Sequence, residues 1–380
     1  MSDPDSVDGP RTTYPTVRLN ESSMREGMQI ESASIPVEDK LRLLGALVAT
    51  GIEQIEVGSF VSPKWTPQMS DIDELLARLP EAPGVRLTAI ALNARGRERR
   101  ARWTPPLESD LLPPLLASHL CSTFLRRNVN ITREKEVANW DGIVADAVSA
   151  GATEAAIGVA AAWGSNFEGK FDHVQRMDAL ALAHAAWTEA GLPVTCVWFA
   201  DPMSWCLPHE IEEQIGLVRA RWPKIRTVHL HLHDARGMAL PSIYAALRAL
   251  DDRFVLSLDV SAGGIGGCPY CGNGRATGMA PTEDVVHMLD GMGIDTGVDL
   301  RTLIDAVRLL DDILGRSTMG HVSKAGPRPD DSSLYDPNLP FVETHAEALH
   351  FVDGAKVAVE GLRPWKEPVP DVRPSGRTSG

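Results

Sequence analysis

The segment His231-Leu232-His233-Asp234 holds two histidines separated by a single residue. On a strand, residues i and i+2 point to the same side, so both imidazoles would share one face. Two imidazoles with a carboxylate suit a divalent metal ion, although a buried, hydrogen-bonded histidine pair would give the same spacing. His229 has the same parity one layer deeper, and there a hydrogen-bonded core histidine is the better interpretation.

Arg25 and Glu26 form a second pair of interest, because they come directly after the first predicted strand. Two histidines do not complete a metal site, and a third ligand should come from the end of another strand. Glu26 is the candidate for that ligand. An Arg–Glu pair on an open surface usually contributes little, but at the catalytic end of a barrel it becomes a candidate part of a site.

A glycine-rich stretch at residues 263–278 has Cys268 in its middle. Glycine permits tight turns and close backbone approach to a ligand. A cysteine on such a loop could donate or accept a proton beside a metal site, and the alternative is a small residue in a turn. Cys268 and Cys271 have dithiol spacing, but this motif normally begins a helix after an early strand, so redox catalysis is not favoured. A regulatory disulfide between them stays open.

A basic cluster follows the third predicted strand and consists of Arg95, Arg97, Arg99, Arg100 and Arg102. Most charge runs are solvated surface. The sharper interpretation is a contact for a phosphate-bearing substrate, because arginine suits phosphate recognition. Arg95 and Arg97 are the residues we expect to bind substrate.

The elements that must position these residues follow an alternating pattern between about residues 17 and 260. Short apolar runs alternate with longer helical patterns, which is typical of parallel strands joined by crossover helices. Eight units fit a (β/α)8 TIM barrel better than an open sheet. The predicted strands are 17–21, 54–58, 86–92, a weakly patterned one at 119–123, 155–159, 194–199, 227–233 and 254–260.

Two of the connecting segments read clearly as helices. One begins at Pro36, carries a stripe of leucines and ends before Gly51. The other covers residues 142–150 and ends before Gly151. Proline at the start and glycine past the end are typical helix boundaries.

The polar residues gather after the predicted strands, where barrel enzymes carry their chemistry. Arg25 and Glu26 follow the first strand, and the histidine pair ends the seventh. Three further candidates also lie at the C-terminal ends of predicted strands, and they are Glu56, Ser59 and Asp201. The sequence therefore predicts one site at one end of the barrel.

Composition limits the function classes. Of 380 residues, 51 are acidic and 37 basic, giving a net charge of −14. An acidic balance argues against nucleic-acid binding, and no apolar run approaches the roughly 18 residues of a membrane span. Residues 1–13 are polar, and the five cysteines form no evident disulfide framework, so we expect a cytoplasmic protein. We divide the chain into a flexible N-terminus (1–14), a barrel domain with C-terminal helices (15–325) and a proline-rich extension (326–380).

Several motifs occur in an order that resembles the family of 3-hydroxy-3-methylglutaryl-CoA lyases. The most extensive is Ile55-Glu-Val-Gly-Ser-Phe-Val-Ser-Pro-Lys-Trp-Thr-Pro-Gln-Met69. The others are Arg25-Glu-Gly-Met-Gln29, Phe167-Glu-Gly-Lys170, His231-Leu-His-Asp234, Gly263-Gly-Ile-Gly-Gly-Cys-Pro-Tyr270, Thr282-Glu-Asp284 and Gly293-Ile-Asp-Thr-Gly297. The resemblance covers about residues 15–325 and places the chain among metal-dependent TIM-barrel lyases and synthases.

The resemblance implies cleavage of a 3-hydroxyacyl-CoA to an acyl-CoA and an oxo product. Arg25 would hold the enolate oxygen, and Cys268 would be the acid/base of the loop. His231 and His233 would ligate the metal, with His231 sharing the proton transfer. By the same resemblance, supporting roles fall to Glu56, Asp201 and Glu283, and substrate contacts to Gln29 and Ser59. The family also implies Mg or Mn and a homodimer or larger assembly.

Two departures from the family pattern bear on the metal. Glu26 stands where the family has aspartate, and its longer side chain can still ligate. Met279 stands where the family has an asparagine ligand, and a thioether is a poor ligand for magnesium. Asn273 could supply the missing oxygen, or water could fill the position. A set of two histidines and one carboxylate would favour Mn, Zn, Fe or Co.

Two other functions fit the same residues. One is a synthase that condenses an acyl-CoA with an oxoacid, or an oxoacid aldolase, which the stretch Gly272-Asn-Gly-Arg-Ala-Thr-Gly278 weakly favours. The other is a catalytically weakened barrel that binds an acyl-CoA or a partner, motivated by the two altered ligand positions.

Overall fold

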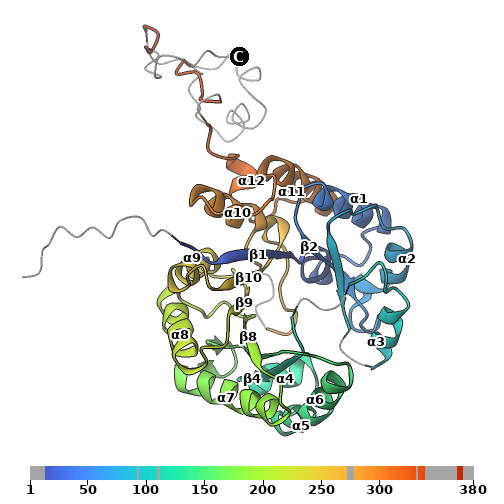
Figure 1. Cartoon of the computed structure of the whole chain (residues 1–380). Coiled ribbons are helices and arrows are strands. Elements are labelled where there is room, and N and C mark those ends of the chain that lie inside the picture. Colours follow the sequence, from blue (N-terminus) through green and yellow to red (C-terminus); the bar gives the residue numbers. More distant parts are fainter. Residues whose placement is uncertain are drawn as a thin grey trace, which may run out of the picture.

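The computed structural model describes residues 13–91, 94–108, 112–271, 278–330, 333–338 and 366–370. One curled sheet of eight parallel strands forms its centre (Figure 1). The strands are β1 (Thr16–Glu21), β2 (Gln54–Ser59), β3 (Arg86–Ile90), β4 (Leu115–His119), β5 (Ala155–Ala160), β8 (Val194–Asp201), β9 (Thr227–Leu232) and β10 (Val255–Val260).

The sheet order is β3-β2-β1-β10-β9-β8-β5-β4, so chain neighbours are sheet neighbours around a curled wall. Among the described residues, no ladder joins β3 to β4. A two-stranded hairpin of β6 (Gly164–Ser165) and β7 (Gly169–Lys170) follows β5. The prediction of an eight-unit α/β barrel is confirmed.

Helices cover the outside of the strands in a ring (Figure 1). They are α1 (Val37–Val48), α2 (Ile72–Ala77), α3 (Ala94–Ala101), α4 (Ser122–Asn128), α5 (Arg133–Ala138), α6 (Trp140–Ser149), α7 (His173–Glu189), α8 (Pro208–Arg221), α9 (Ala239–Ala249), α10 (Thr282–Gly291), α11 (Leu300–Leu314) and α12 (Val322–Ala325). Short turns are η1 (Ser23–Gly27), η2 (Met28–Ile30), η3 (Pro67–Met69) and η4 (Ala262–Gly264).

The helix boundaries follow the local chemistry of the sequence. Helix α1 begins after Pro36 and buries Leu43, Leu44 and Leu47 against the sheet, as the leucine stripe predicts. Helix α7 begins with a capping box, in which Asp172 accepts from the Gln175 amide and the Gln175 side chain accepts in return. This exchange satisfies two amides that a helix N-terminus otherwise leaves open.

The fourth strand differs from its prediction. It lies at residues 115–119, and the region predicted as strand, 119–123, instead begins helix α4. The Cys121 sulfur caps that helix by accepting from the Phe124 amide. The sequence Leu-Leu-Ala-Ser-His of β4 does not alternate apolar with polar residues, although burial alternates along it, and cysteine is not a typical cap residue. The predicted third strand also extended to Leu92, which lies outside the described residues.

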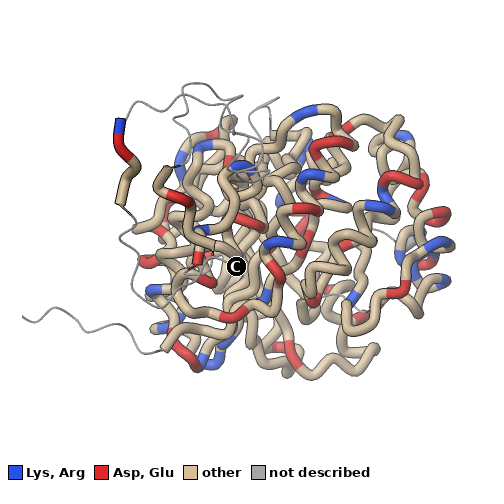
Figure 2. The backbone as a smooth tube through the Cα atoms, turned by 90° about the horizontal axis from the view of Figure 1, so that it is seen from above, with Lys and Arg blue, Asp and Glu red and all other residues tan. Residues whose placement is uncertain are grey.

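The hydrophobic core lies between the strands and the helix ring. Leu230 and Leu232 of β9 are buried against the helices, while His229 and His231, which alternate with them, face the interior. On the surface, residues of both charges are interspersed along the chain (Figure 2). Within the described residues, no helix is both long enough and apolar enough to cross a bilayer.

Candidate metal centre and active site

Three side chains from two strand ends meet at the mouth of the barrel. His231 lies in β9 and His233 just after it, and Glu26 lies in the η1 turn that follows β1. One ligand atom from each lies within 4.8 Å of the other two. The two Nε2 atoms are 3.1 Å apart, and His233 Nε2 is 3.8 Å from Glu26 Oε1. The structure therefore brings together the three ligands predicted from the sequence.

Asp259 orients the histidines, and the sequence analysis missed it. It stands opposite His231 in the register of β10 against β9, and its Oδ2 lies 2.8 Å from His231 Nδ1. Its Oδ1 lies 3.1 Å from His229 Nε2 and also accepts from Asn20 Nδ2. A signal was available, because Ser257 and Asp259 are polar positions of one parity in an apolar strand.

The donor set fits a divalent cation. Asp259 holds a proton on His231 Nδ1, which leaves the Nε2 lone pair free to ligate. Two nitrogens at right angles on one metal, each at about 2.1 Å, lie about 3 Å apart, close to the observed separation. His233 Nδ1 is buried without a hydrogen-bond partner within the described part of the chain. It is consistent with a neutral ring that presents Nε2 to a cation.

The charges around the imidazoles act on them unequally. Burial opposes protonation of His231, but the hydrogen bond and charge of Asp259 outweigh it and raise its pKa. Burial and the cations His231 and Arg25 hold the pKa of His233 well below its usual range. Of the two imidazoles, His233 is therefore the one held neutral, and His231 is the one that binds a proton more readily.

Arg25 is held between two carboxylates at the same mouth. It pairs with Glu26, and its Nε donates to Glu56 Oε2 at 2.5 Å. Burial disfavours the charged guanidinium, but the charges of Glu56 and Glu26 outweigh it and raise the pKa of Arg25. Burial raises the pKa of Glu56 despite its cationic partner. A fixed cation beside the ligand triad is suited to stabilising a developing oxyanion.

Glu21, a second residue missed from the sequence, ties the site's backbone together. Its Oε1 accepts from the amides of Ser23 and Ala262, and its Oε2 accepts from the Thr282 hydroxyl. These contacts join the η1 turn, the glycine-rich loop and the start of α10. Burial raises the pKa of Glu21. In the sequence it was one acidic residue between Asn20 and Ser22, with no spacing to mark it.

Glu283 lies in the first turn of α10 and supports the same loop. Its Oε2 accepts from the Gly263 amide at 2.9 Å, while Oε1 is buried with no partner among the described residues. Burial raises the pKa of Glu283 to about 7. The structure thus places Glu283 behind the loop.

The loop that carries Cys268 begins against the ligand turn. A Cβ added to Gly266 would lie 3.3 Å from the Glu26 carbonyl oxygen, and φ there is +121°. Glycine is needed at that close approach. Cys268 is half-buried, and both Cys268 and Cys271 are free thiols. Hydrogen bonding of the Cys271 thiol to Cys268, together with burial, raises the pKa of Cys271.

The remaining predicted residues lie at different depths in the site. Gln29 Nε2 donates to Glu26 Oε2 at 3.0 Å, so it contacts a ligand. Ser59 is buried at the end of β2. Asp201 ends β8, and its two oxygens accept from the Trp205 and Cys206 amides. Burial raises the pKa of Asp201 to about 6.

Met279 stands beside the metal centre. It is fully buried and pairs with His233 in an isolated antiparallel bridge. A residue at this position is therefore adjacent in space to a ligand, which agrees with its alignment to a ligand position. Asn273, the predicted substitute oxygen ligand, lies outside the described residues.

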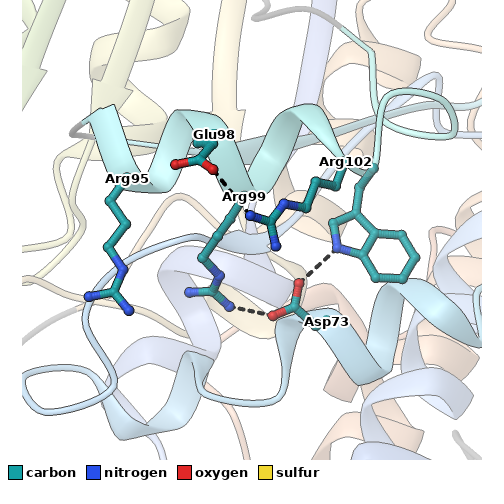
Figure 3. Close-up of a pocket in the computed structure, with 6 residues that line it drawn as sticks. Asp73, Arg95, Glu98, Arg99 and Arg102 are labelled. Atoms are coloured by element: carbon teal, nitrogen blue, oxygen red, sulfur yellow. Dashed lines mark hydrogen bonds and ion pairs between the residues drawn. The ribbon is translucent and has the colours of Figure 1, made fainter.

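The arginine cluster forms a separate, open cavity on α3. Its volume is about 440 Å³, and its lining residues are Asp73, Arg95, Glu98, Arg99, Arg102 and Trp103 (Figure 3). Arg99 pairs with Asp73, and Arg102 pairs with Glu98. Arg95 lines the cavity without a partner among the described residues, whereas Arg97 is exposed and does not line it. The two predicted substrate contacts are therefore not brought together.

Comparison with known proteins gives consistent matches. The HMGL-like family model matches residues 16–310. A 3-hydroxy-3-isohexenylglutaryl-CoA/hydroxy-methylglutaryl-CoA lyase from Pseudomonas aeruginosa is 33% identical over 312 residues, which cover 81% of this chain and 96% of that protein. The solved HMG-CoA lyase of Bacillus subtilis is 28% identical with a TM-score of 0.69, covering 82% and 98% of the two chains. An HMG-CoA lyase from Acinetobacter baumannii, solved with coenzyme A and 3-methylmalate, has a TM-score of 0.68 at 28% identity, covering 83% and 96%.

Proposed function

The chain belongs to the HMGL-like family, and on this premise we propose that it is a metal-dependent carbon–carbon lyase. Its substrate is a 3-hydroxyacyl-CoA, either 3-hydroxy-3-methylglutaryl-CoA or a relative, which it cleaves to an acyl-CoA and an oxo product. The observation that carries the proposal is the Glu26–His231–His233 cluster with Arg25 beside it. The similar lyase solved with coenzyme A supports the thioester part of the substrate.

The bond changes follow from the groups at the barrel mouth. The proton of the substrate's 3-hydroxyl group passes to a carboxylate at the mouth, and Glu56, whose pKa burial raises, is the candidate. His231 keeps its Nδ1 hydrogen bond to Asp259 and presents Nε2 as a ligand, so it has no free nitrogen for that proton. The C2–C3 bond breaks, its electron pair passes to the thioester as an enolate, and C3 becomes the carbonyl of the oxo product. Arg25 stabilises the enolate oxygen. Cys268 returns a proton to the enolate carbon, which completes the acyl-CoA.

A divalent cation held by Glu26, His231 and His233 would polarise the substrate hydroxyl and lower its pKa. For this chain, we assign a transition metal such as Mn, Fe, Co or Zn rather than Mg. Imidazole suits these ions, whereas Mg prefers an oxygen shell, and the triad offers one carboxylate beside two nitrogens. The buried Met279 next to His233 removes a further oxygen donor.

Two measurements test the proposal. Elemental analysis of the purified protein identifies the bound metal, and a transition metal at one per chain is the expected result. A panel of 3-hydroxyacyl-CoA thioesters should then release a short acyl-CoA only when the metal is present. No turnover of any panel member with any of these metals would refute the lyase, and release of free CoA from an acyl-CoA and an oxoacid would indicate a synthase instead.

A further inference from the structure

The loop that carries Cys268 is held at two anchors at the barrel mouth. Near its start, Gly266 packs against the Glu26 backbone. At residue 271, the Cys271 thiol donates to the carbonyl of Pro202, just after β8, at 3.2 Å. The described part of this loop thus runs from β10 toward β8, and Cys268 lies along the loop between the two anchors.

Asn166, in the turn between β6 and β7, contributes to the second anchor. Its Nδ2 donates to the carbonyl oxygen of Cys271 at 3.2 Å. Its Oδ1 accepts from Trp205 Nε1 at 3.1 Å and from Arg236 Nη2 at 3.3 Å. One side chain therefore joins the cysteine loop to the loops that follow β8 and β9.

The amide group is required for this combination of contacts. Two donors converge on Oδ1, so the amide is oriented with Nδ2 toward the Cys271 carbonyl. The backbone N–H of Asn166 donates to the Met203 sulfur, 3.2 Å away. Trp205, which fixes Oδ1, is itself held because its backbone amide donates to Asp201 at 3.0 Å. The contacts therefore run from the end of β8 to the cysteine loop.

We propose that Asn166 is a positioning residue that holds Cys268 in place for proton transfer. The inference rests on the proposed lyase function, in which Cys268 protonates the enolate carbon. Arg127 of α4 supports the same loop, since its Nε donates to the Tyr270 carbonyl at 2.8 Å. Asn166 differs from Arg127 in linking the loop to the β8 and β9 ends, from which Asp201 and His233 come.

The test variant is Asn166→Asp, because it keeps the oxygen that Trp205 and Arg236 contact and removes the Nδ2 donor to Cys271. A carboxylate facing that carbonyl would also repel it. The first readout is the alkylation rate of Cys268 by iodoacetamide in the metal-loaded full chain, followed by peptide mass spectrometry. We expect this rate to rise about three- to tenfold, since one hydrogen bond of ordinary strength is lost. In the lyase assay, kcat should fall by about the same factor, with KM changed less than twofold.

Asn338→Asp is the matched control, because it makes the same change at a residue whose Nδ2 donates to the Val369 carbonyl and not to the cysteine loop. Its alkylation rate should stay within twofold of the parent. An unchanged rate in Asn166→Asp, or an equal rise in Asn338→Asp, would overturn the assignment. The alkylation readout does not depend on turnover. A faster rate in a protein without lyase activity would therefore uphold the positioning of Cys268 and refute the proposed function.

Discussion

The metal centre and the α3 cavity both place arginines beside carboxylates, but they differ in exposure. At the centre, the Arg25 side chain is 15% exposed, and its partners Glu26 and Glu56 are 5% and 9% exposed. In the cavity, Arg102 and Glu98 are 70% and 72% exposed. The same residue types therefore form a buried network at the strand ends and a solvated surface on the helix.

This difference in burial decides which region can do chemistry. Water screens exposed ion pairs, so their net contribution is small. Buried groups cannot be compensated by solvent, and their proton affinities respond strongly to each neighbour. The centre accordingly contains the shifted pKa values of His231, His233 and Glu56. The predictions below test the contrast, from the largest expected effect to the smallest.

His233→Ala should give the largest loss, because it removes one of two imidazole ligands from the buried triad. We expect kcat/KM to fall about a thousandfold or more, which corresponds to about 4 kcal/mol of transition-state stabilisation. Metal content should fall with it when the protein is dialysed and analysed for bound metal.

His173→Ala is the control for that measurement, because the His173 side chain is 46% exposed on α7 and belongs to no part of the centre. Its activity and metal content should match the parent. A His233→Ala protein that keeps its full metal content and full activity would show that the buried cluster of Glu26, His231 and His233 is not the active site.

Glu283→Gln tests the buried carboxylates by their effect on stability. The folded-state pKa of Glu283 is about 7, above its ordinary value of 4.5. Between these pH values the folded state keeps a proton that the unfolded state has lost, so this group destabilises the fold as pH rises. In the glutamine variant that contribution disappears. The free energy of unfolding of the variant relative to the parent should therefore rise from pH 5 to pH 8 by at most about 3 kcal/mol.

Urea unfolding at both pH values measures this difference. Glu212→Gln is the exposed counterpart, because its side chain is 46% exposed, and it should show no pH-dependent difference from the parent. If the Glu283→Gln difference is the same at pH 5 and pH 8, the carboxyl is not held in its protonated form by burial.

Asp259→Asn tests whether the carboxylate that orients His231 contributes to metal affinity. The amide keeps the shape of the carboxylate but can present its nitrogen to His231 Nδ1, which would favour the wrong tautomer. We expect metal affinity to fall about 10- to 100-fold, as is typical for lost partners of ligating histidines. Titration of the metal-free protein by calorimetry would measure it, and an unchanged affinity would show that His231 needs no orienting carboxylate.

The predictable parts of the molecule were those that local sequence encodes. Alternating apolar runs located seven of the eight strands, and the i, i+2 spacing placed His231 and His233 on one face. The fourth strand was predicted too late in the chain, because its residue types do not alternate between apolar and polar and a cysteine caps the next helix.

The residues that sequence reasoning missed depend on contacts between distant segments. Asp259 meets His231 through the register of β10 against β9, and Glu21 meets Thr282 across 261 positions of the chain. The parity of Ser257 and Asp259 marks polar positions on one face of the strand, but no spacing within either segment identifies the partner. Asn166 was missed for the same reason, since its role depends on three loops that only the fold brings together.

Arg95→Ala should give the smallest effect. Arg95 is exposed at the start of α3 and lines the cavity that Arg97 does not reach. If the cavity holds an anionic part of the acyl-CoA, loss of this solvated charge should raise KM about two- to fivefold at low salt and leave kcat unchanged. The increase should shrink at high salt, because screening weakens exposed charges. Arg97→Ala serves as the comparison and should leave KM unchanged. An equal response of both variants would indicate long-range attraction, and no response in either would place the anionic end of the substrate away from this cavity.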